Sequence, residues 1–247
     1  MNTYIAFILS SIAGFSTMLG SLIIFLSKKK SLNFLISGIA FAAGVMFFLS
    51  IFDLIPESIL FLKNTYKIIP SILISLISLS IGVCISIIID KLFPNTFDEK
   101  SLYKLGLITM IGIIVHNIPE GIATFITTNE SLQLGISITL AITMHNIPEG
   151  ISIALPIYYY TKSKKKAILY TFICAISEPF GALIAYLFLE PTTTTLGLVY
   201  SVIAGIMVHI SMYELLPNAL KYKRYKITYL FYILGLIFVL INKLIFN

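Results

Sequence analysis

The sequence contains little charge for its length. Of its 247 residues, 11% are Asp, Glu, Lys or Arg, whereas 58% are hydrophobic and the mean hydropathy is +0.98. A soluble domain needs about 25% charged residues to cover its surface, so this composition excludes an ordinary soluble enzyme. The net charge of +6 does not indicate a nucleic-acid partner, because Lys and Arg are grouped between apolar runs and not along an amphipathic face. The composition predicts an integral membrane protein.

Cysteine is also scarce. Cys84 and Cys174 are the only two cysteines, and both lie inside apolar runs. This number and placement exclude a disulfide framework and do not indicate a thiolate metal cage. We interpret both as small residues of the core.

Apolar runs of the length that crosses a bilayer recur along the whole chain. About 20 apolar residues span the hydrocarbon core as a helix. We find eight such runs, at residues 4–26, 34–62, 68–89, 105–128, 132–158, 167–189, 196–216 and 227–245. No basic segment precedes the first run, which is therefore expected to be a span and not a signal peptide. The expected fold is all-α: a polytopic membrane protein with eight transmembrane helices in a single domain, residues 1–247.

Lys and Arg between the runs predict the orientation, because short loops rich in these residues stay in the cytoplasm. Loops one, three, five and seven carry fourteen of them, namely Lys28, Lys29, Lys30, Lys91, Lys100, Lys104, Lys162, Lys164, Lys165, Lys166, Lys221, Lys223, Arg224 and Lys226. The opposite side carries three, Lys63, Lys67 and Lys243. We therefore expect a multi-pass protein of the plasma membrane with both termini outside.

Two internal repeats stand out. Residues 43–58 read AGVMFFLSIFDLIPES and residues 204–219 read AGIMVHISMYELLPNA, and HNIPEG occurs at both 116–121 and 145–150. The copies fall in runs that would cross in opposite directions, which predicts an inverted repeat of spans 1–3 and 6–8 around antiparallel spans 4 and 5. Inverted repeats with Pro-interrupted central helices are typical of secondary transporters. The alternative is a duplicated structural bundle without transport.

Ionisable residues lie inside the runs. They are Asp53, Glu57, Glu120, Glu149, Glu178 and Glu214, together with His116, His145 and His209. An ionised acid at a membrane helix centre costs about 2.5 to 3.5 kcal/mol on insertion scales. We expect no Lys or Arg within the runs to neutralise these acids, so either they are protonated or a bound cation supplies the positive charge.

The HNIPEG motifs favour the cation. At 100° per residue the polar residues of each motif share one helix face: His116, Asn117 and Glu120 in the fourth run, and His145, Asn146 and Glu149 in the fifth. Glu178, followed by Pro179, supplies a further carboxylate from the sixth run. Imidazole favours Zn, Fe, Ni and Cu over Mg and Ca, and the absence of thiolate argues against a tight structural zinc site. The pattern predicts a transport site for a divalent transition metal; the alternative is a set of hydrogen-bonded helix contacts.

The other repeat predicts a cation pathway. Asp53 and Glu57 share a helix face with Met46, and Glu214 occupies the corresponding face of the seventh run. The topology places Asp53 and Glu57 toward the outside and Glu214 toward the cytoplasm, where acids would concentrate cations. For Glu57, an interfacial acid wetted by headgroup water is an equal alternative. His209 does not lie on this face, and we expect it to have either a packing role or a role at the pore exit.

These motifs resemble the ZIP (ZRT/IRT-like) family of divalent metal transporters, most closely its ZupT-type bacterial branch. The resemblance covers essentially the whole chain: the doubled HNIPEG, SEPFGA at 177–182, the repeated AG-x-M and eight spans. It implies uptake of Zn(II), Fe(II) and similar ions into the cytoplasm through the inner membrane, by alternating access of spans 1, 4, 5 and 6 against spans 2, 3, 7 and 8. Many relatives carry a His-rich loop between spans three and four, whereas residues 93–104 hold no His.

The resemblance also implies a binuclear centre. One metal position would use His116, Glu120, His145 and Glu149, with Met46 as a further ligand. The other would use Asn117, Glu120, Asn146, Glu149 and Glu178, so that Glu120 and Glu149 bridge the two ions. The metal is cargo and no resident cofactor is expected. The expected partners are divalent ions and lipid, and a homodimer is one assembly to be considered.

Two other functions would explain part of this pattern. A metal-dependent intramembrane hydrolase would also hold zinc with His and Glu, but H-E-x-x-H is absent and the symmetric motifs offer no distinct acid, base and nucleophile. A proton or monovalent-cation antiporter explains the acids but leaves the paired His and Asn without a role. We therefore expect a transporter and not an enzyme.

Overall fold

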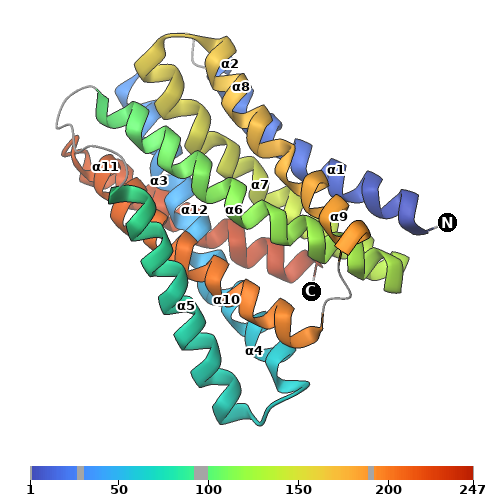
Figure 1. Cartoon of the computed structure of the whole chain (residues 1–247). Coiled ribbons are helices and arrows are strands. Elements are labelled where there is room, and N and C mark those ends of the chain that lie inside the picture. Colours follow the sequence, from blue (N-terminus) through green and yellow to red (C-terminus); the bar gives the residue numbers. More distant parts are fainter. Residues whose placement is uncertain (1, 27–30, 92–99, 189–191, 247) are drawn as a thin grey trace.

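The structure is a computed structural model that describes residues 2–26, 31–91, 100–188 and 192–246 (Figure 1). Within these ranges the chain forms helices joined by short turns, and no strand occurs among them. The predicted all-α fold is therefore confirmed. Most of the His-free segment 93–104 lies outside the described residues.

The helices follow one another closely along the chain. Their bounds are α1 (Asn2–Ser21), α2 (Ile23–Leu26), α3 (Leu32–Leu49), η1 (Ser50–Leu54), α4 (Ile55–Lys63), α5 (Ile68–Lys91), α6 (Lys100–Glu130), α7 (Leu132–Thr161), α8 (Lys164–Ala175), α9 (Ser177–Phe188), α10 (Thr193–His209), η2 (Ile210–Leu215), α11 (Leu216–Leu220) and α12 (Tyr225–Phe246). The two η segments are π-helical turns.

Seven helical segments of the described chain are long and apolar enough to cross a membrane. They are Thr3–Phe25, Leu32–Lys63, Ile68–Lys91, Leu102–Asn129, Lys164–Phe188, Thr193–Leu220 and Tyr225–Leu244, and they coincide with seven of the eight predicted runs. The remaining run is α7, a continuous helix of 30 residues. Every residue from Pro148 to Tyr159 in α7 is buried. A helix enclosed by other helices can carry polar side chains, which lowers its hydropathy.

The helices pack as two groups. The first group contains α1, α6, α7, α8 and α9, with α7 against α1 and α6, and α6 against α9. The second group contains α3, α4, α5, α10, α11, α12 and the two π-helical turns, with α3 against α12 and α10 against α5. Contacts of α3 with α7 and of α10 with α6 join the groups. In Figure 1, α5 and α10 lie apart from α1 and α8, with α6 and α7 between them.

Both copies of the longer repeat contain a π-helical turn at the same place. The amide of Ile55 donates to the carbonyl of Ser50, and the amide of Leu216, 161 positions later, donates to the carbonyl of Ser211. Each turn is followed by a proline at an equivalent position, Pro56 or Pro217. Because proline has no amide donor, the regular α-helical bonding cannot continue through it. The sequence repeat is therefore also a repeat of local structure.

The predicted sixth span is divided into two helices. α8 ends at Ala175 and α9 begins at Ser177, with Ile176 between them. Pro179 removes the amide that would bond to the carbonyl of Ala175, and its ring would crowd that carbonyl in a continuous helix. The break lies next to Glu178 and fixes the start of the helix that carries this carboxylate.

Candidate metal site

The two HNIPEG motifs meet at the contact between α6 and α7. The His116 Nε2 atom lies 2.9 Å from Glu149 Oε1, and the His145 Nε2 atom lies 3.2 Å from Glu120 Oε1. Each histidine is therefore paired with the glutamate of the other motif, as expected for neighbouring antiparallel helices. All four side chains are buried.

Asparagines connect these pairs to neighbouring helices. The Asn146 amide donates to the Glu178 carboxylate and, at 2.9 Å, to the carbonyl of Ala13 in α1. The Asn117 amide donates to the carbonyl of Cys174, next to the break before α9, at 3.5 Å. Gly121 allows α6 to pack closely against α9, because a Cβ at position 121 would collide with the backbone of Glu178. The structure thus brings Glu178 together with both motifs.

Each of the seven polar side chains has one buried atom without a hydrogen-bond partner among the described residues. These atoms are His116 Nδ1, Asn117 Oδ1, Glu120 Oε2, His145 Nδ1, Asn146 Oδ1, Glu149 Oε2 and Glu178 Oε2. In a neutral imidazole whose Nε2–H donates to a carboxylate, Nδ1 carries the lone pair. With both imidazoles in this neutral form, all seven atoms can donate electron pairs. A buried polar atom without a partner costs about 1 to 3 kcal/mol, so the cluster favours a cation.

The side chains are not already gathered around one point. Among the described residues, no group of three or more His, Cys, Asp and Glu is arranged so that it could hold a metal ion. Each imidazole instead uses one nitrogen in its bond to a carboxylate. A metal ion that bound both the imidazole and the carboxylate of a pair would have to replace the hydrogen bond between them.

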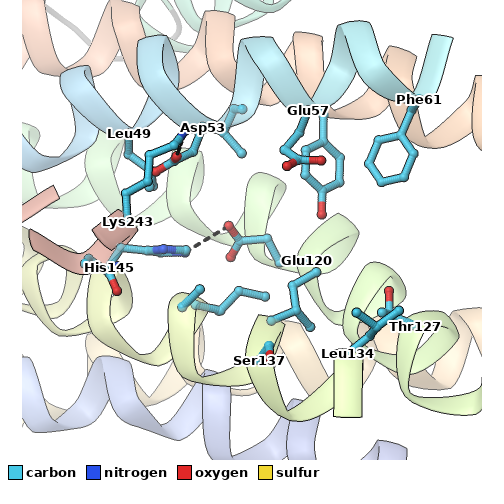
Figure 2. A pocket seen from close by; sticks show the side chains of 16 residues that line it. Leu49, Asp53, Glu57, Phe61, Glu120, Thr127, Leu134, Ser137, His145 and Lys243 are labelled. Carbon is cyan, nitrogen blue, oxygen red and sulfur yellow. Dashed lines mark hydrogen bonds and ion pairs between the residues drawn. The ribbon is translucent and has the colours of Figure 1, made fainter. Parts of the chain in front are cut away.

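A cavity lies next to this cluster. It has a volume of ≈ 430 Å³ and is lined by Glu120 and His145 from the first group and by Asp53 and Glu57 from the second. Figure 2 shows the His145 and Glu120 pair facing Asp53, Lys243 and Glu57 across the cavity. The pair of His116 and Glu149, both fully buried, does not line it. The cavity therefore reaches only one of the two pairs.

The expectation that no basic residue lies within the runs was wrong. Lys243, in the last turn of α12, lies in the eighth run, and its Nζ atom is 2.8 Å from Asp53 Oδ1. Asp53 thus has a fixed counter-charge, whereas Glu120, Glu149 and Glu178 form no ion pair with a Lys or Arg of the described residues. The sequence signal was the Asn242-Lys243 dipeptide in an otherwise apolar run. Asn242 and Tyr200, also missed, line the cavity.

Three predicted residues lie away from this cavity. Met46 is fully buried in the core on α3 and does not line the cavity. Glu214, in η2, lies against Asp90, which is paired with Lys104 at 2.8 Å. His209 bonds through Nδ1 to Ser86 Oγ at 2.9 Å and stacks on Tyr213. These contacts fit a packing role for His209, and the roles of His209, Met46 and Glu214 stay predictions.

Known proteins resemble the chain over nearly its full length. Residues 95–243 match a family model described as "ZIP Zinc transporter". A protein named zinc transporter ZupT from Clostridium perfringens is 37% identical over 99% of this chain and 97% of its own length. Proteins of the same name from Campylobacter jejuni and Chlorobium chlorochromatii are 40% and 35% identical, over 90% and 100% of this chain and 89% and 99% of their own lengths. With its membrane-spanning helices, the chain is an integral membrane protein and belongs to the ZIP zinc transporter family.

Proposed function

We propose that the protein imports divalent transition-metal ions, with zinc and iron as the expected cargo. The observation that carries this proposal is the set of seven buried polar atoms of α6, α7 and α9 that have no hydrogen-bond partner in the described part of the chain. Imidazole, carboxylate and amide oxygen together suit Zn(II) and Fe(II). The relatives are named as zinc transporters, which agrees with zinc. Lys243 neutralises Asp53 but leaves this cluster without a fixed cation.

We propose two metal positions in the cluster. One is formed by His116, Glu120, His145 and Glu149, with Met46 as a further ligand, and the other by Asn117, Glu120, Asn146, Glu149 and Glu178. An arriving cation would take the place of the two histidine–glutamate hydrogen bonds, so that the carboxylate oxygens turn from imidazole to metal. Weak, multi-ligand binding of this kind allows release as well as capture.

The route runs between the two groups of helices. The cavity carries Asp53 and Glu57 on the side with few lysines, which the distribution of Lys and Arg places outside. Glu214 lies toward the opposite, cytoplasmic side. The first group moves against the second, and this alternately exposes the site to each side. The mode of transport is thus alternating access, with the direction from outside to cytoplasm.

In this proposal α7 is also a span, the fifth along the chain, which brings the number of spans to eight and places both termini outside. A helix of 30 residues is about 45 Å long at 1.5 Å per residue, which is enough to cross a bilayer. Eight crossings make the two copies of each repeat run in opposite directions, as an inverted repeat does. The alternative of an intramembrane hydrolase gains no support, since the relatives are named as transporters.

Uptake by purified protein in liposomes tests this function. Liposomes are offered a panel of labelled divalent ions outside, with a pH gradient imposed or collapsed. Wild type is expected to accumulate zinc, whereas Glu120→Gln and Glu149→Gln should reduce uptake to that of empty liposomes while the protein stays folded. Glu190→Gln, an acid between two predicted runs, is the matched control and should transport normally. Unchanged uptake in both site variants would refute the site.

A further inference from the structure

The repeat extends to the helices that pack on it. Gly44 of α3 lies against the carbonyl of Tyr232 in α12, and Gly205 of α10, 161 positions after Gly44, lies against the carbonyl of Leu79 in α5. A Cβ at either glycine would collide with that carbonyl. α5 and α12 are therefore equivalent partners of the two repeat helices, with Leu79 corresponding to Tyr232 at an offset of 153.

These two offsets relate the charged pairs at the ends of the repeats. Asp53 corresponds to Glu214 at the offset of 161, and Asp90 corresponds to Lys243 at the offset of 153. Equivalent positions thus hold an acid and a base in one half, and two acids in the other half. Glu214 lies against Asp90, whose countercharge, Lys104, comes from α6 of the other group. Of the two halves, only the one that lines the cavity has a base, Lys243, at this position of the repeat.

Local structure holds Lys243 at this position. Pro56 has no amide to offer the carbonyl of Phe52, four residues earlier, so that carbonyl is free to accept a bond from elsewhere. The Lys243 ammonium donates to the Phe52 carbonyl and to Asp53 together. Its side chain is still 39% exposed and lines the cavity, so it has room to leave Asp53.

The charge of Lys243 opposes the proposed cargo. Among the described residues that line the cavity it is the one Lys or Arg, beside the acids Asp53, Glu57 and Glu120. A fixed positive charge there repels an arriving dication and occupies an oxygen that the dication could use. An ion pair that only fastened α12 to η1 would not need to face the cavity.

We propose that Lys243 is a tethered cation that competes with arriving metal for Asp53 and thereby limits the affinity with which the cavity admits divalent ions. This inference rests on the proposed import function. A metal that reaches the cavity displaces the ammonium from Asp53, and the ammonium returns when the metal moves on to Glu120 and His145. The cavity therefore exchanges ions and does not retain them.

Zinc uptake kinetics in liposomes test this role. Lys243→Gln and Lys243→Met, which keeps the aliphatic stem, should each lower the KM for zinc about threefold or more, because one repelling charge is removed. Lys243→Arg retains the charge and should keep the wild-type KM. Lys63→Gln is the matched control: it removes a charge exposed at the end of α4, which is predicted to lie on the same membrane face, and should not lower KM.

The Asp53→Asn background separates competition from general repulsion. If Lys243 competes for Asp53, adding Lys243→Gln to Asp53→Asn should change KM by less than about twofold. An unchanged or raised KM in both neutral variants, or loss of folded protein in both, would overturn the proposal and leave the pair as a structural fastening. Absence of zinc uptake by wild type would instead contradict the import function itself.

Discussion

At the residue scale, the proposed metal site contains buried acceptor atoms that no side chain in the described residues satisfies. Glu149 is the sharpest case, since one of its oxygens bonds to His116 and the other has no partner although the residue is fully buried. A bound cation would contact such atoms, and a ligand that binds only the folded state stabilises it. Metal should therefore affect the stability of the protein as well as be transported by it.

Zinc is predicted to raise the unfolding temperature of the purified protein. At a free concentration 100 times the Kd the stabilisation should be about 2.7 kcal/mol. Glu149→Gln removes a charged ligand but lets the side chain accept from His116, so the metal-free protein should not be destabilised while the shift with zinc largely disappears. Thermal unfolding with and without zinc measures both. A full shift in Glu149→Gln would contradict the role of Glu149.

The sequence indicates the polar residues of α6, α7 and α9 more fully than the contact between Lys243 and Asp53. The pairing of His116 with Glu149 follows from one motif placed on two adjacent antiparallel helices, and Glu178 was identified by its place in a membrane run. The contact of Lys243 with Asp53 joins residues 190 positions apart and depends on how α12 packs on α3. No local pattern encodes that contact, and the sequence places Lys243 only as one of three lysines expected on the outer side.

At the scale of the helix, irregularities surround the polar residues. Pro179 explains the break between α8 and α9, because proline disrupts the bond to Ala175. The π-helical turns are less directly related to the sequence. Pro56 and Pro217 indicate a disturbance of the helix, but they do not indicate that it takes the form of a π-helical turn. Asp53 and Glu214 both lie in these turns, so the irregular backbone determines their direction.

α7 is predicted to cross the membrane although its hydropathy is low. Single cysteines at Gln133 and Lys165, just inside α7 and just after it, should then react with a membrane-impermeant thiol reagent from opposite sides, in a Cys84→Ser background. Asn64→Cys and Lys91→Cys, at the two ends of the apolar helix α5, form the control pair. Labelling of both α7 positions from one side would show that this helix does not span the membrane. The chain would then cross the membrane seven times and not eight.

At the scale of the whole molecule, the cavity lies between the two groups of helices and not within either. Its walls come from α6 and α7 on one side and from α3, η1, α4, α10 and α12 on the other. Relative movement of the groups would close it at this end, as alternating access requires. Sequence alone suggested this division only through the family resemblance, because packing partners are not encoded by hydropathy.

A covalent cross-link between the two groups of helices is predicted to stop transport. Phe61 of α4 and Leu134 of α7 line the cavity from the second and first groups (Figure 2). Cysteines at both positions, joined by a short bifunctional thiol reagent, should abolish zinc uptake, and uptake should return with a cleavable reagent after cleavage. The control joins Thr65 and Thr194, whose hydroxyl groups are 2.8 Å apart within the second group, and should leave uptake unchanged. Normal uptake by the first linked pair would exclude movement between the groups.

The most direct measurement of the central claim is the position of bound zinc by anomalous diffraction from crystals of the protein grown with zinc. We predict a peak between α6 and α7, within about 2.0 to 2.2 Å of nitrogen or oxygen atoms of His116, Glu120, His145 or Glu149. The histidine–glutamate hydrogen bonds should then be replaced by bonds to metal. Crystals at saturating zinc that show no peak there, with both hydrogen-bonded pairs intact, would contradict the account.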